Sequence, residues 1–141
     1  MISKKEYQYS VELGPDGPLP RAIAFGVEIQ KNGASFPTEG IIDTGCGSIV
    51  INKSIAVAKF GVDLSKCKTR KFGGFGGVQN ACISEVTLRF NDFDLEFETP
   101  VLFADFAGEL VLGDPFFTHF NVVLERHKYK FTLIPITGLK K

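Results

Sequence analysis

The sequence predicts a single, mostly β domain with one or two short helices. Its 141 residues suit one domain and are enough to bury a core. Apolar and polar residues alternate in several short stretches, as in residues 84–90, where Val86, Leu88 and Phe90 would share one face of a strand. Glycine, proline and asparagine separate these stretches at short intervals, and neither repeats nor a linker interrupt them.

The first half of the chain predicts strands, a hairpin and a helix. A short strand is followed by residues 14–20, GPDGPLP, which are dense in proline and glycine and are expected to be a loop. Residues 22–30 have strand composition, and Asn32-Gly33 is a strong hairpin signal that leads into a second strand ending near residue 42. After a strand-like stretch at 48–51, residues 53–60 favour a helix, with Asn52 or Ser54 as N-cap and Gly61 as the stop.

The second half of the chain returns to strands. Residues 68–103 alternate as strands do, apart from the glycine-rich run at 73–77, and residues 109–113 form a short apolar stretch. Residues 114–121 predict one or two helical turns, with Asp114 as N-cap and Pro115 at the first helical position. A hairpin around residues 126–128 is expected to close the chain.

Charge and cysteine content exclude several classes of function. The net charge is zero and no Lys/Arg run marks a surface for nucleic acid. No apolar run approaches the roughly 20 residues of a membrane helix, and the N-terminus does not resemble a signal peptide, so a cytoplasmic location is expected unless a parent chain carries targeting information. Cys46, Cys67 and Cys82 lack metal-ligand spacing, which favours free thiols in a reduced compartment over a disulfide or a metal role.

One polar turn stands between two apolar runs in residues 40–51, GIIDTGCGSIVI. A carboxylate at the end of a buried strand is costly unless something pairs or uses it. Asp43 has two interpretations: a cap on nearby backbone N–H groups in a tight turn, or a chemical group held in place by that turn.

Four glycines surround one phenylalanine in residues 73–77, GGFGG. A plain hairpin turn needs fewer glycines than this. Glycines allow a backbone to approach a ligand closely, to adopt positive φ and to hinge, which are the requirements of a flap over a bound peptide.

Three segments in this order resemble the retropepsin-type aspartic proteases: the turn IIDTGCGS at 41–48, the flap-like KFGGFGGV at 71–78, and LVLGDPFFTHFNVVL at 110–124. The resemblance that these segments carry covers roughly residues 22–134. The resemblance implies an all-β, closed, barrel-like retropepsin fold with half of the active site in each chain. It also implies one protease domain over 1–141, in which residues 1–20 are an extension without a clear counterpart in the family.

The resemblance also implies a mechanism and its residues. Two carboxylates share a proton, and one activates water while the other polarises the scissile carbonyl of a peptide or protein substrate. The chain has one Asp-Thr-Gly, so a homodimer is expected, with no metal or organic cofactor. The implied catalytic residues are Asp43, Thr44 and Gly45, and the implied substrate-binding residues are Gly45, Cys46, Gly47, Phe72, Gly73, Gly74, Phe75, Gly76, Gly77 and Val111. Leu112 would pack behind the turn and Gly113 would allow close packing against it.

The sequence departs from the family pattern at three positions. Cys46 stands where alanine or serine is usual, Gly47 where serine or aspartate is often found, and Asp114 where retroviral enzymes carry an arginine that supports the dimer. Two other interpretations therefore remain: a dimerisation or peptide-binding module of the same fold with little turnover, and a structural β protein in which the motif is coincidental.

Overall fold

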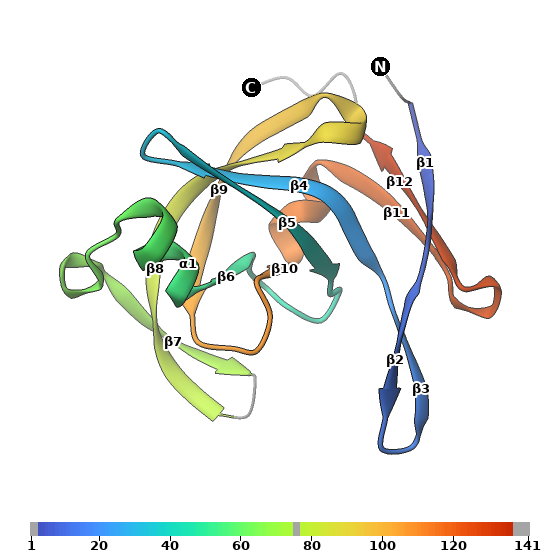
Figure 1. Ribbon diagram of the computed structural model, residues 1–141, viewed down its shortest axis with the longest axis horizontal. Helices are drawn as coiled ribbons and strands as arrows, with labels where there is room; N and C mark the ends of the chain where they lie inside the picture. Colours follow the sequence, from blue (N-terminus) through green and yellow to red (C-terminus); the bar gives the residue numbers. More distant parts are fainter. Residues whose placement is uncertain (1–2, 75–76, 137–141) are drawn as a thin grey trace.

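The computed structural model describes residues 3–74 and 77–136, and its strands and helix α1 are labelled in Figure 1. The strands are β1 (Lys5–Gln8), β2 (Ser10–Gly14), β3 (Gly17–Arg21), β4 (Ile23–Lys31), β5 (Ala34–Ile42), β6 (Val50–Asn52), β7 (Thr69–Gly74), β8 (Gly77–Phe90), β9 (Leu95–Ala104), β10 (Leu110–Leu112), β11 (Phe120–Glu125) and β12 (Lys130–Pro135). The helices are α1 (Lys53–Phe60) and the short 3-10 helices η1 (Leu64–Lys66), η2 (Asn91–Phe93), η3 (Asp114–Thr118) and η4 (Arg126–Lys128). Within the described ranges, no helix has the length and apolar character to cross a membrane.

The main sheet closes into a ring of strands. Its order is β4-β5-β10-β6-β9-β8-β7, and β4 also pairs with β8 from Val27 opposite Phe90 to Gln30 opposite Thr87. Alternate residues of these strands point inward, and Ile29, Leu88 and Phe90 are almost completely buried there. The predicted mostly β fold is confirmed.

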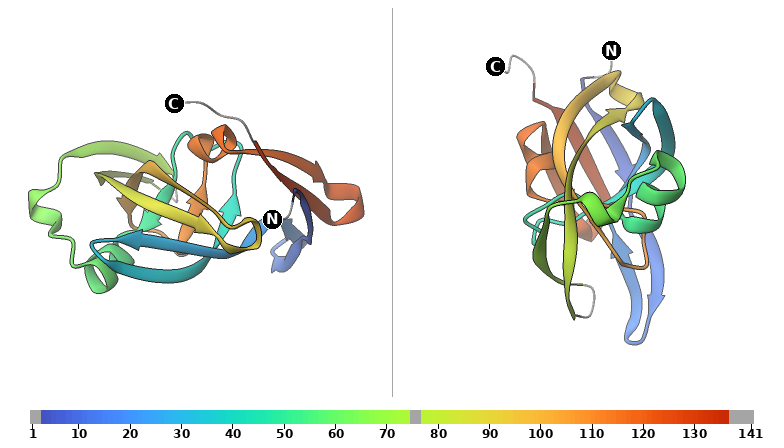
Figure 2. Two further views of the ribbon diagram at one scale, coloured as in Figure 1. Left: turned by 90° about the horizontal axis from the view of Figure 1, so that it is seen from above. Right: turned by 90° about the vertical axis from the view of Figure 1, so that its left-hand side faces the viewer.

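A second, three-stranded sheet has the order β1-β12-β11 and flanks the ring (Figure 2). The ring of Tyr7 in β1 stacks on Phe131 in β12 with centroids 5.1 Å apart. Lys5 Nζ and the Tyr7 hydroxyl both donate to Asp92 Oδ2 in η2, at 2.8 Å and 2.9 Å. Burial, with the neighbouring Asp92 carboxylate, raises the pKa of Tyr7, so its hydroxyl remains a donor in this contact. These bonds hold the N-terminal strand against the main sheet.

The helix and the hairpins confirm their local sequence signals. In α1, Asn52 is the N-cap and its side chain accepts from the Ser54 N–H, while Gly61 ends the helix with φ of 63°. Asn32 and Gly33 both have positive φ, as a two-residue hairpin turn requires. The closing hairpin of β11 and β12 turns through η4, as predicted.

Two local expectations are wrong. Residues 14–20 are not a loop throughout, because β2 and β3 pair from Ser10 opposite Arg21 to Gly14 opposite Gly17. Each strand of this two-stranded ladder has an outer edge without a partner strand. Prolines fit there because no N–H donor is needed on that edge. Asp114 is not an N-cap: the cap position of η3 is Gly113, and no side chain caps it.

Strand β9 runs without interruption through Pro100. Its partner on one side, β8, pairs along the whole length, whereas β6 pairs only with Leu102–Ala104 on the other. Pro100 therefore has a partner strand on one side only. At such a position, a residue without a backbone N–H is tolerated.

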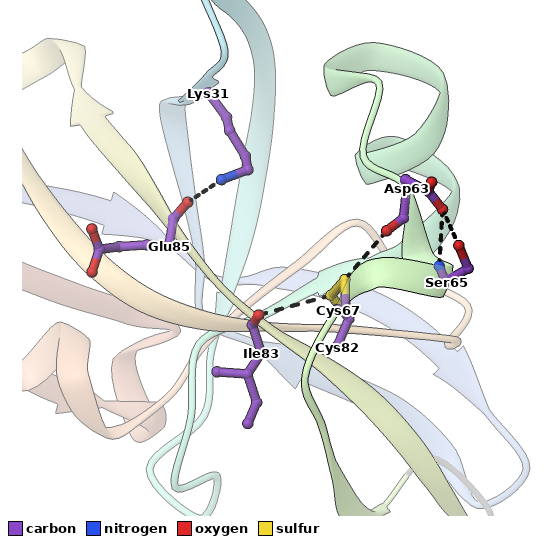
Figure 3. The surroundings of a disulfide bond; sticks show 7 residues. All are labelled: Lys31, Asp63, Ser65, Cys67, Cys82, Ile83 and Glu85. Atoms are coloured by element: carbon purple, nitrogen blue, oxygen red, sulfur yellow. Dashed lines mark hydrogen bonds between the residues drawn. A yellow bond between two sulfur atoms is a disulfide. The ribbon is translucent and has the colours of Figure 1, made fainter.

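Cys67 and Cys82 form a disulfide, with Cα atoms 5.4 Å apart, so the expectation of three free thiols is wrong for these two (Figure 3). Cys67 follows η1, and Cys82 lies in β8 opposite Thr69 of β7. The pairing of β7 with β8 thus brings the two cysteines within bridging distance. Cys46 is free. The inference of a reduced compartment, which rested on free thiols, loses its support.

Candidate active site

Asp43 lies at the point where two parallel strands end together. β10 pairs with β5 through Val111 opposite Ile41 and Leu112 opposite Ile42. The Asp43 N–H donates to the Leu112 carbonyl at 3.1 Å, directly after that ladder. Ile42 and Leu112 are buried, but Asp43 is exposed. The exposed carboxylate of Asp43 therefore lies at the common end of two paired, buried strands, which hold it in place.

The turn after Asp43 is held by its own hydrogen bonds. The Gly45 N–H donates to Asp43 Oδ1 at 2.9 Å, and the Cys46 N–H donates to the Asp43 carbonyl at 3.3 Å. Asp43 therefore caps the turn, as one interpretation of the sequence expects. Only Oδ1 is used: in residues 3–74 and 77–136, no donor contacts Oδ2 or the Thr44 side chain. The cap leaves one carboxylate oxygen for chemistry.

Gly113 allows the turn to pack closely on the chain after β10. A Cβ atom on Gly113 would lie 2.0 Å from the Ser48 carbonyl oxygen and 2.5 Å from the Cys46 carbonyl oxygen. The next residue continues this contact, since the Asp114 N–H donates to the Cys46 carbonyl at 2.8 Å. The expected close packing of Gly113 against the turn is confirmed.

Two hollows meet at Asp43. One, of about 300 Å³, is lined by Glu12, Arg21, Ile41, Asp43, the loop residues 106–108 and Val111. The other extends towards Tyr9, Leu124 and Arg126 and shares Arg21, Ile41 and Asp43 with the first. Val111, expected near a substrate pocket, lines the first hollow together with Asp43 and is itself almost buried.

Sequence reasoning missed Arg21, which lines both hollows beside Asp43. Arg21 Nε lies 3.3 Å from Glu12 Oε2 as an ion pair, although the two are not aligned as a hydrogen bond. Glu12 belongs to β2 and Arg21 ends β3, so the hairpin of the N-terminal extension contributes to the site. No motif in the sequence marks these residues; the pairing of β2 with β3 brings them together.

The glycine-rich segment lies in the hairpin that β7 and β8 form. Phe72 pairs with Gln79, Gly73 with Val78, and Gly74 with Gly77, which is the last described pair of this ladder. Gly74 has φ of 151°, a conformation that favours glycine. Phe75 and Gly76, also expected to bind substrate, lie outside the described residues. The β7–β8 hairpin projects from the same side of the molecule as the β2–β3 hairpin (Figure 1).

A small apolar cluster lies beneath the hairpin and the turn. Val50, Ala81, Leu102, Ala104 and Val111 form it, and Phe72, Cys46 and Phe106 pack against its rim. The turn, the hairpin and the 105–109 loop therefore share one support. Three of the expected site residues, Cys46, Phe72 and Val111, are brought to this cluster.

The loop at 105–109 is held from two sides. Asn52 Nδ2 donates to the Phe106 and Gly108 carbonyls, both at 2.8 Å. Gln79 Nε2 donates to the Asp105 carbonyl and Gln79 Oε1 accepts from the Asp105 N–H, each at 2.8 Å. Gln79 thus joins the second strand of the hairpin to the loop that lines the Asp43 hollow. No local sequence pattern marks this contact.

Among residues 3–74 and 77–136, no group of three or more His, Cys, Asp or Glu lies where it could hold a metal ion. The groups near the turn include the Asp43 carboxylate, the Thr44 hydroxyl, the free Cys46 thiol and backbone N–H groups.

No protein-family model and no curated protein matches the sequence. Solved structures do match the fold. The crystal structure of a retropepsin-like aspartic protease from Rickettsia conorii has a TM-score of 0.61 over 94% of this chain and 100% of that chain, at 19% identity. The EIAV protease complexed with the inhibitor HBY-793 has a TM-score of 0.47 over 70% of this chain and 85% of its own, at 24% identity. The match to the Rickettsia conorii structure shows that the chain has the fold of retropepsin-like aspartic proteases.

Proposed function

We propose that this chain is one subunit of an aspartic endopeptidase whose active site forms between two copies. The observation that carries the proposal is the presentation of Asp43: an exposed carboxylate with one unbonded oxygen, at the end of two buried strands, in a retropepsin-like fold. A turn that needed only a cap would not require this carboxylate to line two hollows.

The reaction needs two carboxylates, and the second is proposed to be Asp43 of another copy. One ionised carboxylate takes a proton from water, and the other, protonated, donates to the scissile carbonyl oxygen. Glu12 lines the same hollow as Asp43, but its carboxylate lies 3.3 Å from Arg21 Nε. Glu12 is therefore already engaged in an ion pair within its own chain. Two-fold symmetry supplies an equivalent partner instead.

Other residues near Asp43 also have roles in the proposed reaction. The Thr44 hydroxyl, which has no described partner, would bond to the turn of the other copy and keep the two carboxylates coplanar. Gly45, Cys46 and Gly47 would accept the substrate main chain along the turn. β7 is the last strand of its sheet, so its outer edge and the glycine-rich tip would pair with an extended peptide. No cofactor is required.

The decisive experiment is cleavage of a peptide library between about pH 3.5 and 7 by the wild type and Asp43→Asn. Loss of cleavage in the variant, together with inhibition by a statine-type compound, is expected. Mixing tests the shared site: wild type exchanged with excess Asp43→Asn should lose activity in proportion to the mixed dimers formed. Activity that instead follows the amount of wild-type chain would contradict a site made from two copies.

The alternative is a peptide-binding module of the same fold. A folded dimer, established by sedimentation, that binds library peptides without cutting them would favour this alternative. The cytoplasmic location expected from the sequence stays a prediction.

A further inference from the structure

We propose that Arg70 forms a subsite that selects an acidic side chain in the substrate, several residues from the cleaved bond. The inference rests on the proposed function and adds the class of substrate. It concerns a hollow of about 220 Å³ between the catalytic turn and the arm of the β7–β8 hairpin.

The hollow has an apolar wall and one cationic group. Ile83, Pro100, Val101, Leu102 and Pro115 supply the wall, with Val101 and Leu102 almost buried at its base. Gly47, Ser48 and Arg70 complete the lining. A side chain with methylene groups and a terminal carboxylate matches this combination, because its stem would contact the wall and its charge would meet the guanidinium.

Arg70 and Ser48 present donors that a carboxylate can use together. Arg70 Nη2 donates to Ser48 Oγ at 2.9 Å, which leaves the Ser48 hydroxyl hydrogen free to donate elsewhere. Within the described parts of the chain, Arg70 makes no ion pair with a carboxylate. The guanidinium has five N–H donors in total, so several remain for a ligand.

The place of the hollow indicates which substrate residue would enter it. Gly47 and Ser48 follow the Asp-Thr-Gly turn, and Arg70 precedes Phe72 at the arm of the hairpin. Asp43, Thr44 and Gly45 do not line the hollow. A substrate extended between turn and hairpin advances about 3.3 Å per residue, so the acidic residue would lie away from the cleaved bond and not beside it.

Edge strands often carry cations merely to prevent aggregation, and Lys71 provides the control for that explanation. Lys71 is exposed, has the same charge and follows Arg70 in β7, but successive side chains of a strand point to opposite faces. It does not line the hollow. If positive charge in general attracted an acidic substrate, replacing either residue would weaken the preference for acidic side chains. A subsite would lose this preference only when Arg70 is replaced.

The test uses peptides of one cleavable sequence in which each position in turn is Glu or Gln. At pH 6, one position several residues from the cut should show roughly a fivefold higher kcat/KM for Glu, through KM. This ratio should fall to near one in Arg70→Gln and be retained in Lys71→Gln. It should also fade below about pH 4, where the Glu side chain of the peptide becomes protonated, and decrease with salt.

Two results would overturn the subsite: no position with a Glu preference, or equal loss of the preference in Arg70→Gln and Lys71→Gln. Cleavage of the Gln peptides shows independently that the proposed function holds. If no peptide is cut, fluorescence anisotropy of the labelled Glu and Gln peptides bound to each protein decides the same question. A Glu preference in binding that Arg70→Gln removes would retain the subsite without the protease, and equal binding would exclude it.

Discussion

Cys67 and Cys82 join the two ends of the β7–β8 hairpin, 15 residues apart in the sequence. Cys82 is also where β8 begins to pair with β9, opposite Phe103. Beyond that point the hairpin is a two-stranded ribbon. The disulfide therefore lies where the ribbon leaves the sheet.

Replacing both cysteines by serine should destabilise the protein and loosen the hairpin. Closing a loop of this length is worth about 3 kcal/mol in the chain-entropy account. Thermal unfolding should therefore begin at a lower temperature, and KM for peptides should rise. Dithiothreitol should lower the melting temperature of the wild type to that of the double variant and leave the double variant unchanged. An equal effect of the reductant on both proteins would exclude the disulfide as its target.

Gly113→Ala should be strongly destabilising because the new Cβ meets backbone oxygens. The Ser48 and Cys46 carbonyls would lie at 2.0 Å and 2.5 Å and cannot rotate away. We expect a loss of roughly 2–4 kcal/mol in the free energy of unfolding. Gly47→Ala is the matched control, because nothing lies within 4 Å of a Cβ there. Urea titrations of the two variants should differ clearly, and similar midpoints would refute the close packing.

Asn52 has two roles that two substitutions can separate. Its Oδ1 caps α1 and its Nδ2 holds the loop carbonyls of Phe106 and Gly108. Asn52→Ala should lose about 1–3 kcal/mol of unfolding free energy. Asn52→Asp keeps the cap but places a carboxylate against two carbonyls, so hydrogen exchange should become faster in residues 105–109 and stay slow in α1. Faster exchange in α1 alone would contradict the loop role.

Asp92 should make stability depend on pH in the acid range. The hydrogen bond from Lys5, with help from Tyr7 and against the opposing effect of burial, holds the pKa of Asp92 below its ordinary value of 3.8. A carboxyl whose pKa is lower in the folded state stabilises the fold above the unfolded value and loses this effect as pH falls through the folded pKa. Asp92→Asn should therefore cost roughly 1 kcal/mol at pH 7.

The pH profile is the check on Asp92. The difference between wild type and Asp92→Asn should shrink as the pH falls below about 4 in denaturant titrations. Asp16→Asn, at the exposed turn between β2 and β3, removes the same charge without a described ion-pair partner and should show no such trend. A constant difference at every pH would mean that Asp92 acts through packing.

The sequence predicted the features that depend on near neighbours. Asn52 and Gly61 bound α1 because caps act within a few residues, and Asn32-Gly33 turns the chain by its own conformational preference. The outward turn at Asp43 followed from the change between apolar and polar residues. The Asp-Thr-Gly turn could therefore be located before any tertiary contact was known.

The missed features depend on distant pairing. Asp92 joins Lys5 and Tyr7 across 87 and 85 positions, and no local pattern marks such a contact. The disulfide depends on which residue of β8 lies beside the start of β7, which the cysteine count does not reveal. Pro18 and Pro20 suggested a loop because proline is rare in central strands, but β2 and β3 form a separate ladder.

The disulfide at the base of the β7–β8 hairpin affects how proteolytic cleavage of this segment can be detected. If one copy cut another between residues 67 and 82, the two fragments would stay covalently attached through sulfur. Such a nicked chain would migrate as a single band on a gel without reductant and differ from the intact protein by one added water. Autolysis at the glycine-rich tip would be visible only after reduction, or by mass.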